Sequence, residues 1–289
     1  MNSDIMEDVR DVLIYKYLND IPESCKIDFV ITKKEIFNEG NLKIKDQNLF
    51  TKYVRQIKWS YKFSNDTIRL EKHQSDTRNY EEIEIINLIL KDDNLRELKK
   101  SQNKVDSYFK QDKQLNRIVE IIFRTIRYPL VVILQYKSKI RAYVTNITIN
   151  KVDSTKYTLD DIIKTNWIDL EAEEHNEFEE KLFEDLKLDN LDFTNAYTFY
   201  NSILGAIVHY NGSRRTGTNI VDKSTKEIRS INKQIEAVNR KIRKLEQEVK
   251  NETQFNRKVE LNMEFNKLKN QKEELKTQLK EEKSWIKLN

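Results

Sequence analysis

The sequence predicts an α+β fold, with an antiparallel-rich sheet and packed helices, followed by a C-terminal antiparallel coiled-coil hairpin. Segments with helical spacing of apolar residues come first and last, and alternating, strand-like segments fall between them. The regular strand-helix alternation of a doubly wound parallel sheet is missing. Residues 222–289 carry a heptad repeat that breaks once, in the middle. These observations favour a globular domain over residues 1–211 and a helical-hairpin arm over 222–289.

Apolar spacing, caps and turn residues define the elements of the globular domain. The elements expected, in chain order, are helix 4–18, strand 27–32, a short helix ending near 40, helix 46–57, strand 58–64, strand 80–91, helix 106–126, strand 130–134, its returning strand 140–144, and helices 174–187 and 194–209.

Local signals fix several of these boundaries. Pro22 ends the first helix, because proline lacks the N–H that a helix needs. Thr32 and Glu35 have the spacing of a capping box for the short helix that ends near Gly40. The run Leu130–Leu134 is apolar throughout, as in a strand that is covered on both faces.

The turn after this strand, Lys137-Ser138-Lys139, indicates a β-hairpin, although it lacks the common Asn-Gly pair. A polar joint, Ser213-Arg214-Arg215-Thr216-Gly217, precedes the heptads.

The arm carries two apolar stripes, separated by a loss of phase between residues 250 and 258. Each stripe spans about 23 residues, or roughly 35 Å of helix at 1.5 Å per residue. Two stripes of similar length predict a helix folded back on itself, whose seam holds a partner or a second copy. A helical pair packed on the protein's own body, or a continuous coiled-coil dimer with a skip, would carry the same pattern. Asn251 and Thr253 are candidate caps at the tip, where Phe255 and Val259 are expected to pack across the turn. The predicted interface comprises Ile228, Ile231, Ile235, Val238, Ile242, Leu245, Val249, Phe255, Val259, Leu261, Phe265 and Leu268.

Composition narrows the class of protein. The net charge is +4, with 18 Lys and Arg against 12 Asp and Glu in residues 222–289. This modest excess is not the dense basic face of a typical nucleic-acid-binding domain. Cys25 is the only cysteine, so an internal disulfide and a cysteine zinc site are excluded. The polar N-terminus and the short apolar runs predict a cytoplasmic protein without a signal peptide or a membrane span.

One weak catalytic pattern is present. A nuclease of the PD-(D/E)xK type combines an acidic residue on one strand with an acid-x-Lys on the next, so that the acids bind Mg²⁺. Glu84, with Glu82 beside it, supplies acids, and Gln135 and Lys137 imitate the second half. The same polar residues would also be found at a strand end that is exposed to solvent. The sequence therefore favours a protein without catalytic activity.

Cofactor sites are not predicted. The three histidines lack the spacing of a zinc helix, and phosphate-binding glycine loops are absent, so we expect neither metal nor cofactor. Arg214, Arg215, Arg240 and Lys241 are candidate phosphate contacts. Charged outer positions are also what any soluble coiled coil carries, so nucleic acid is weakly supported as a ligand.

Several segments together resemble a bacterial family, the domain of unknown function 4391. They are QIKWSYK (56–62), EI (84–85), RYPLVVILQY (127–136), RAY (141–143), TNW (165–167) and, in the arm, QFNRKVELN (254–262). Many relatives place an acidic residue where this chain has Gln135. The resemblance implies an accessory protein found near helicases and DNA methyltransferases in restriction-like and antiphage clusters, and it implies no particular activity.

The expected function combines the heptads with this resemblance. We expect a non-catalytic accessory or scaffold subunit of a bacterial DNA-processing or antiphage defence complex. Its arm would associate with a helicase, a methyltransferase or a second copy. The alternatives are a divergent metal-dependent nuclease and a DNA-binding sensor subunit.

Overall fold

The structure is a computed structural model, and it describes residues 21–91, 105–149, 157–220 and 223–280. The expected helix 4–18 lies outside the described residues. The chain divides into two compact units, residues 1–204 and residues 205–289. The division falls inside helix α8 (Ala196–Thr216), before the polar joint expected at residues 213–217.

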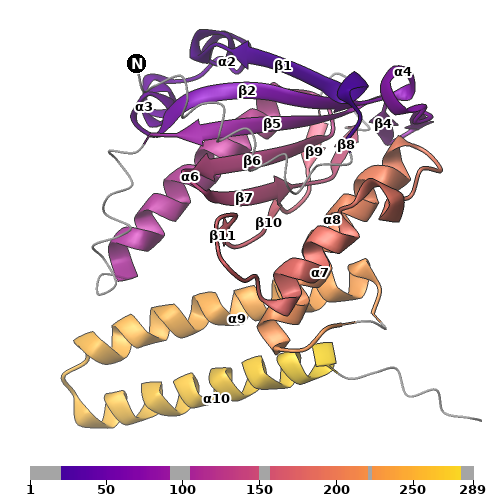
Figure 1. Ribbon diagram of the computed structural model, residues 1–289. Helices are drawn as coiled ribbons and strands as arrows, with labels where there is room; N and C mark the ends of the chain where they lie inside the picture. The colour runs from indigo at the N-terminus through magenta and orange to yellow at the C-terminus, as the bar shows by residue number, and fades with distance from the viewer. Residues whose placement is uncertain (1–20, 92–104, 150–156, 221–222, 281–289) are drawn as a thin grey trace, which may run out of the picture. The chain divides into compact units, whose positions relative to one another are not determined.

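The first unit is built around a mixed, mostly antiparallel sheet, shown in Figure 1. Its strands lie in the order β1 (Lys26–Ile31), β2 (Val54–Phe63), β5 (Ile83–Leu90), β6 (Leu130–Tyr136), β7 (Lys139–Val144) and β10 (Ile163–Lys164), and β11 (Ile168–Asp169) also pairs with β7. Within this sheet β5 and β6 run parallel, connected through α6 (Val105–Thr125). Two small hairpins pair β3 (His73–Ser75) with β4 (Arg78–Tyr80) and β8 (Ile147–Ile149) with β9 (Tyr157–Leu159).

Shorter helices complete the first unit. They are the 3₁₀ helix η1 (Glu23–Cys25), α2 (Lys33–Glu39), α3 (Ile44–Tyr53), α4 (Asn65–Ile68), α7 (Glu177–Asp185) and the 3₁₀ helix η3 (Leu188–Asn190). The second unit contains the end of α8 together with α9 (Thr225–Asn251) and α10 (Phe255–Lys280). The predicted α+β class is confirmed.

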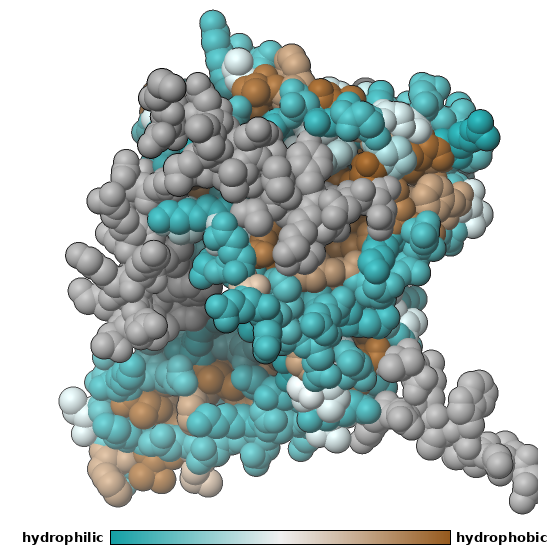
Figure 2. All heavy atoms as spheres, viewed as in Figure 1, coloured by the Kyte–Doolittle hydropathy of each residue, from teal (hydrophilic) through white to brown (hydrophobic). Residues whose placement is uncertain are grey.

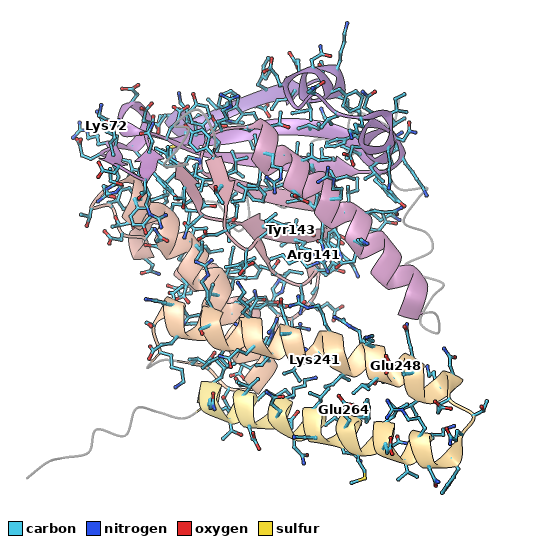
Figure 3. All side chains as sticks on the ribbon, turned by 180° about the vertical axis from the view of Figure 1, so that it is seen from behind. Lys72, Arg141, Tyr143, Lys241, Glu248 and Glu264 are labelled. Atoms are coloured by element: carbon cyan, nitrogen blue, oxygen red, sulfur yellow. The ribbon has the colours of Figure 1, made fainter. Side chains whose placement is uncertain are left out.

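The main core lies between one face of the sheet and the helices α2, α3 and α6. Figure 3 shows α6 crossing this face. Ile86 and Leu88 of β5 and Val132 and Leu134 of β6 are fully buried there. Every residue of β6 is buried, as the unbroken apolar run predicts. On the opposite face the ring of Phe63 packs against Phe199 of α8, with centroids 5.3 Å apart.

Of two local predictions, one is confirmed and the other is wrong. The Thr32–Glu35 capping box is present, and α2 ends at Glu39, with Gly40 as its C-cap. The expected helix 46–57, however, ends at Tyr53, and the next residues belong to β2. Val54 and Ile57 pair with Leu90 and Leu88 of β5 instead. These β-branched residues gain more from the covered sheet than from one further helical turn.

The hydroxyl group of Tyr200 on α8 forms hydrogen bonds at the start of β6 and just after the end of β7. This hydroxyl lies 2.8 Å from the carbonyl oxygens of both Leu130 and Thr145, and it accepts a hydrogen bond from the Thr145 N–H at 3.1 Å. Leu130 opens β6, and Thr145 follows β7, so one hydroxyl serves backbone groups that the sheet leaves unpaired at this edge. The side chain is fully buried.

We predict that Tyr200→Phe lowers the free energy of unfolding by about 1–3 kcal/mol, because buried backbone groups lose their hydrogen-bond partner. Urea unfolding measures the change. Tyr197→Phe on the same helix is the matched control, and we expect it to change stability by less than about 0.5 kcal/mol. Equal effects of the two substitutions would contradict this role for the hydroxyl.

Candidate functional site

The C-terminal helices form a hairpin. Figure 1 shows α9 and α10 side by side, joined by a short link. Ser224 and Glu227 form a capping box that starts α9, with the Ser224 N–H 2.9 Å from the Glu227 carboxylate. At the link, the Glu252 carboxylate accepts hydrogen bonds from the backbone N–H groups of Thr253 and Gln254, at 2.9 and 2.8 Å. The Glu252 side chain thus makes capping hydrogen bonds that were expected from Asn251 and Thr253.

The apolar seam is buried within the second unit. The buried members are Ile228, Ile235, Val238, Ile242 and Leu245 on α9 and Leu261, Leu275 and Leu279 on α10. The half-buried members are Ile231, Val249, Phe265 and Leu268. The prediction that the chain folds back on itself agrees with this arrangement. The seam side chains are therefore not a free docking surface, because the protein's own helices cover them.

The root of the hairpin is fixed by close packing and by Arg215. Gly212 of α8 has no room for a side chain, since a Cβ there would lie 2.8 Å from Ile220 and 3.0 Å from Ile228. The Arg215 guanidinium donates to the backbone and side-chain oxygens of Asn232 and to Glu236, the last at 2.6 Å. The expected polar joint is thus the last turn of α8, which runs through Thr216.

The other candidate phosphate contacts differ from Arg215. Arg215 joins two helices and is not presented to a phosphate. Arg214, Arg240 and Lys241 are exposed, and Figure 3 shows Lys241 on α9. A role for these three residues in phosphate binding stays a prediction.

A second apolar stripe lies at the tip of the hairpin, on α10. Phe255, Val259 and Met263 are 77%, 43% and 69% exposed. At 3.6 residues per turn they share one face, and Val259 lies about 160° around the helix from Leu261. The prediction that Phe255 and Val259 pack across the turn is wrong, because the turn directs them away from the seam. Figure 2 shows apolar side chains gathered at this end of the hairpin.

This exposed stripe is confined to the first turns of α10. Farther along, the same face carries the exposed polar residues Asn266, Asn270 and Thr277. The apolar residues of α9 gather on one side, whereas those of α10 occupy two. A solvated helix needs only one apolar face to pack in a hairpin, so the second face requires another explanation.

The residues of the nuclease alternative do not come together. The parallel register pairs Glu84 with Leu130 and Gln135 with Ile89. Glu84 and Gln135 therefore lie five residues apart along the sheet, about 16 Å, and on opposite faces. Lys137 is exposed in the turn after β6, where its φ is 54°. The arrangement needed for metal-dependent cleavage is absent among these three residues.

Gln135 has a structural partner instead. The amide of Asn87 donates to its side-chain oxygen at 2.8 Å, and both side chains are buried. This pair joins the parallel strands β5 and β6 on the face away from α6.

Glu84 is a buried acid with an altered pKa. Its side chain is 2% exposed, and its Oε1 has no hydrogen-bond partner. Burial, followed by the charge of Glu82 and a hydrogen bond to it, raises the pKa of Glu84 to about 8. Lys62, its neighbour across the strands, is held by Glu82 at 3.2 Å. Glu84 is therefore protonated at neutral pH.

A charged network that the sequence reasoning missed joins α6 to the β7 edge. Arg141 pairs with Asp112 and stacks over the Trp167 ring at 4.8 Å. Lys164 donates to Asp112 at 2.6 Å and to Asn116 at 2.9 Å. Figure 3 labels Arg141 on β7. The spacing of Asp112 and Asn116, four residues apart on one helix, was the available signal.

The network is a clamp and not an acid–base site. Burial opposes ionisation of Asp112, but the hydrogen bond from Lys164 and the charges of Lys164 and Arg141 outweigh it and hold the pKa below its ordinary value. Asp112 is thus ionised and already bound by two cations. In the described part of the chain, no group of three or more His, Cys, Asp or Glu side chains is placed to hold a metal ion. Over the same residues, no helix combines the length and apolarity that a bilayer span requires.

We predict that Ile235→Asp unfolds the hairpin, because a carboxylate at this buried position costs several kcal/mol. Hydrogen exchange should show faster exchange in α9 and α10 while β6 stays protected. Ser230→Asp, at an exposed position of α9, is the control and should leave exchange unchanged. Protection of α9 in the Ile235 variant would contradict a buried seam.

We also predict a pH-dependent effect of Glu84→Gln. The wild-type protein loses stability as the pH rises from about 4.5 to about 8, because the unfolded chain ionises Glu84 in this window and the folded chain does not. Glutamine cannot ionise, so the variant gains relative stability by several kcal/mol across the window, at about 1.4 kcal/mol per pKa unit.

Urea unfolding at a series of pH values tests this prediction. Glu174→Gln, at an exposed position, is the control and should show no such gain. Parallel pH profiles for wild type and the Glu84 variant would show that the acid is not buried in its protonated form.

Comparison with known proteins finds one family. The model of the domain of unknown function DUF4391 matches residues 20–272. The match includes all of α9 and most of α10, so the hairpin is part of the matched span. No curated protein and no solved structure matches the chain.

Proposed function

We propose that this chain, which belongs to the family of domain of unknown function 4391, is an accessory subunit without catalytic activity. It serves a bacterial DNA-processing or antiphage defence complex, and its hairpin docks on a larger protein of that complex, such as a helicase or a methyltransferase. The observation that carries this proposal is the exposed stripe Phe255–Val259–Met263 at the hairpin tip.

The stripe has the properties of a docking surface. Its three side chains stand on successive turns of one helix, the spacing with which a helix enters an apolar groove. Burying such a side chain contributes about 1.5–3 kcal/mol. Polar residues Asn256 and Asn262 flank it, as in the polar rim of an interface. The buried seam beneath it keeps the helix rigid, so little ordering entropy is lost on binding.

A different protein fits this stripe better than a second copy does. A two-fold contact between identical helices is self-complementary, so residues near the axis face their own copies. An axis at Val259 brings Lys258 near Lys258 of the second copy and Glu260 near Glu260 of the second copy. Both contacts are repulsive. The complementary surface therefore belongs to a partner with an apolar groove.

The body of the chain supports a role without catalysis. Two sets of its buried polar groups link elements of the fold, the Asn87–Gln135 pair and the Asp112 clamp. The residues of the nuclease alternative lie apart. These features leave the hairpin tip as the surface best suited to function.

We predict that replacing Phe255, Val259 and Met263 together by serine abolishes docking while the fold is retained. Loss of three buried apolar side chains should weaken the affinity at least about tenfold. The measurement is co-purification with the products of the neighbouring genes, followed by light scattering for mass.

The matched control replaces Asn266, Asn270 and Thr277 by serine, because these residues lie farther along the same face. The control should bind as the wild type does. If the first variant still assembles, the tip is not the docking surface. If wild type alone has the mass of a dimer and the variant that of a monomer, the partner is a second copy.

A further inference from the structure

A hollow in the first unit lies beside the C-terminal end of α6. Its volume is about 590 Å³, within the range of about 300–1,000 Å³ found for small-molecule sites. It is lined by the end of α6, by β4 and β9, by the segment before β6, and by two acidic residues, Glu39 at the end of α2 and Glu81 after β4. None of these residues belongs to the hairpin, so the hollow is independent of the docking surface.

One side of the hollow is basic. Arg124 and Arg127 both line it. The Nε of Arg124 donates to Glu120 at 2.8 Å, which holds this guanidinium in place. Arg127 is exposed, and within the described residues it has no ion pair. One guanidinium group can donate two parallel hydrogen bonds to two oxygens of the same phosphate, so this side of the hollow is suited to bind a phosphate.

Another part of the lining carries hydrogen-bond acceptors. The Oδ1 atom of Asn79 is buried and has no hydrogen-bond partner. Its amide nitrogen donates to the exposed Glu81 carboxylate at 3.1 Å and holds that carboxylate at the lining. A carboxylate oxygen at the lining accepts hydrogen bonds from the N–H groups of a ligand.

Two tyrosines complete the lining. Tyr128 is 40% exposed and Tyr157 is half-buried. Burial, followed by the charges of Glu82, Glu84 and Glu81, raises the pKa of Tyr128, so its ring stays neutral. Neutral aromatic rings are the usual surface on which a nucleobase stacks.

We propose that this hollow binds a nucleotide. The phosphate lies toward Arg124 and Arg127, and a base with an exocyclic amino group lies toward Asn79 and Glu81. Adenine and cytosine present such an amino group on their edges, whereas uracil presents a carbonyl oxygen there. Carboxylates beside the arginines disfavour a polyphosphate, so a single phosphate fits best.

The nucleotide could be free or could be the phosphorylated end of a single strand. Both sources share the same chemistry, so the experiment separates them. Isothermal titration of the full chain uses CMP, AMP, UMP, cytidine and a short single-stranded oligonucleotide with a 5′-terminal cytidine phosphate. We expect CMP or AMP to bind at least about tenfold more tightly than UMP or cytidine. Tighter binding of the oligonucleotide than of CMP assigns the strand end as the ligand, and equal binding assigns the free nucleotide.

Two variants locate the site. Arg127→Gln should weaken CMP binding about tenfold and leave cytidine binding unchanged. Glu81→Ala should remove the preference for CMP over UMP, because it removes the acceptor for the exocyclic amino group. Arg69→Gln, an exposed arginine outside the hollow, is the control. Absence of binding at millimolar concentrations of every ligand overturns the proposal, and so does binding that neither variant alters.

Discussion

Burial of the α9 seam is the constraint on which the second unit depends. Ile235, Val238 and Ile242 are covered by the protein's own helices, and each such side chain contributes about 1.5–3 kcal/mol to folding. Once the seam is filled, it no longer offers a surface to a partner. The stripe at Phe255, Val259 and Met263 stays in solvent because it lies on the far side of α10. The docking role that we propose for the hairpin is therefore assigned to the face that folding leaves uncovered.

In the body of the chain, polar groups are buried where elements must be joined. Asn87 and Gln135 form a hydrogen bond across the parallel strands. Asp112 of α6 binds Arg141 of β7 and Lys164 of β10. Buried polar groups cost free energy when they are unpaired, so satisfied pairs favour one register over others. Glu84 meets the same constraint by keeping its proton. Residues with the composition of a reaction centre thus act as parts of the framework.

Much of the fold could be predicted from local signals. The capping box at Thr32 and Glu35, the buried strand 130–134 and the hairpin after it all depend on neighbours in the chain. The errors occurred where distant segments compete. Val54–Ile57 has a helical pattern, yet it joins β2 because β5 offers a covered partner strand. The Asp112 clamp was missed because its members come from three separate elements.

Local patterns in the chain are sufficient to predict a mixed α+β body and a helix folded back at its C-terminal end. Periodicity, caps and turns act over a few residues, so they can be recognised in the amino-acid sequence. Three features become visible only in the folded protein: which apolar residues are buried, the placement of Glu84 and Gln135 on opposite faces of the sheet, and the hollow that Asn79, Arg127 and Tyr128 line. These facts depend on which remote segments meet, and that choice follows from the total area buried by the whole unit and not from any local pattern.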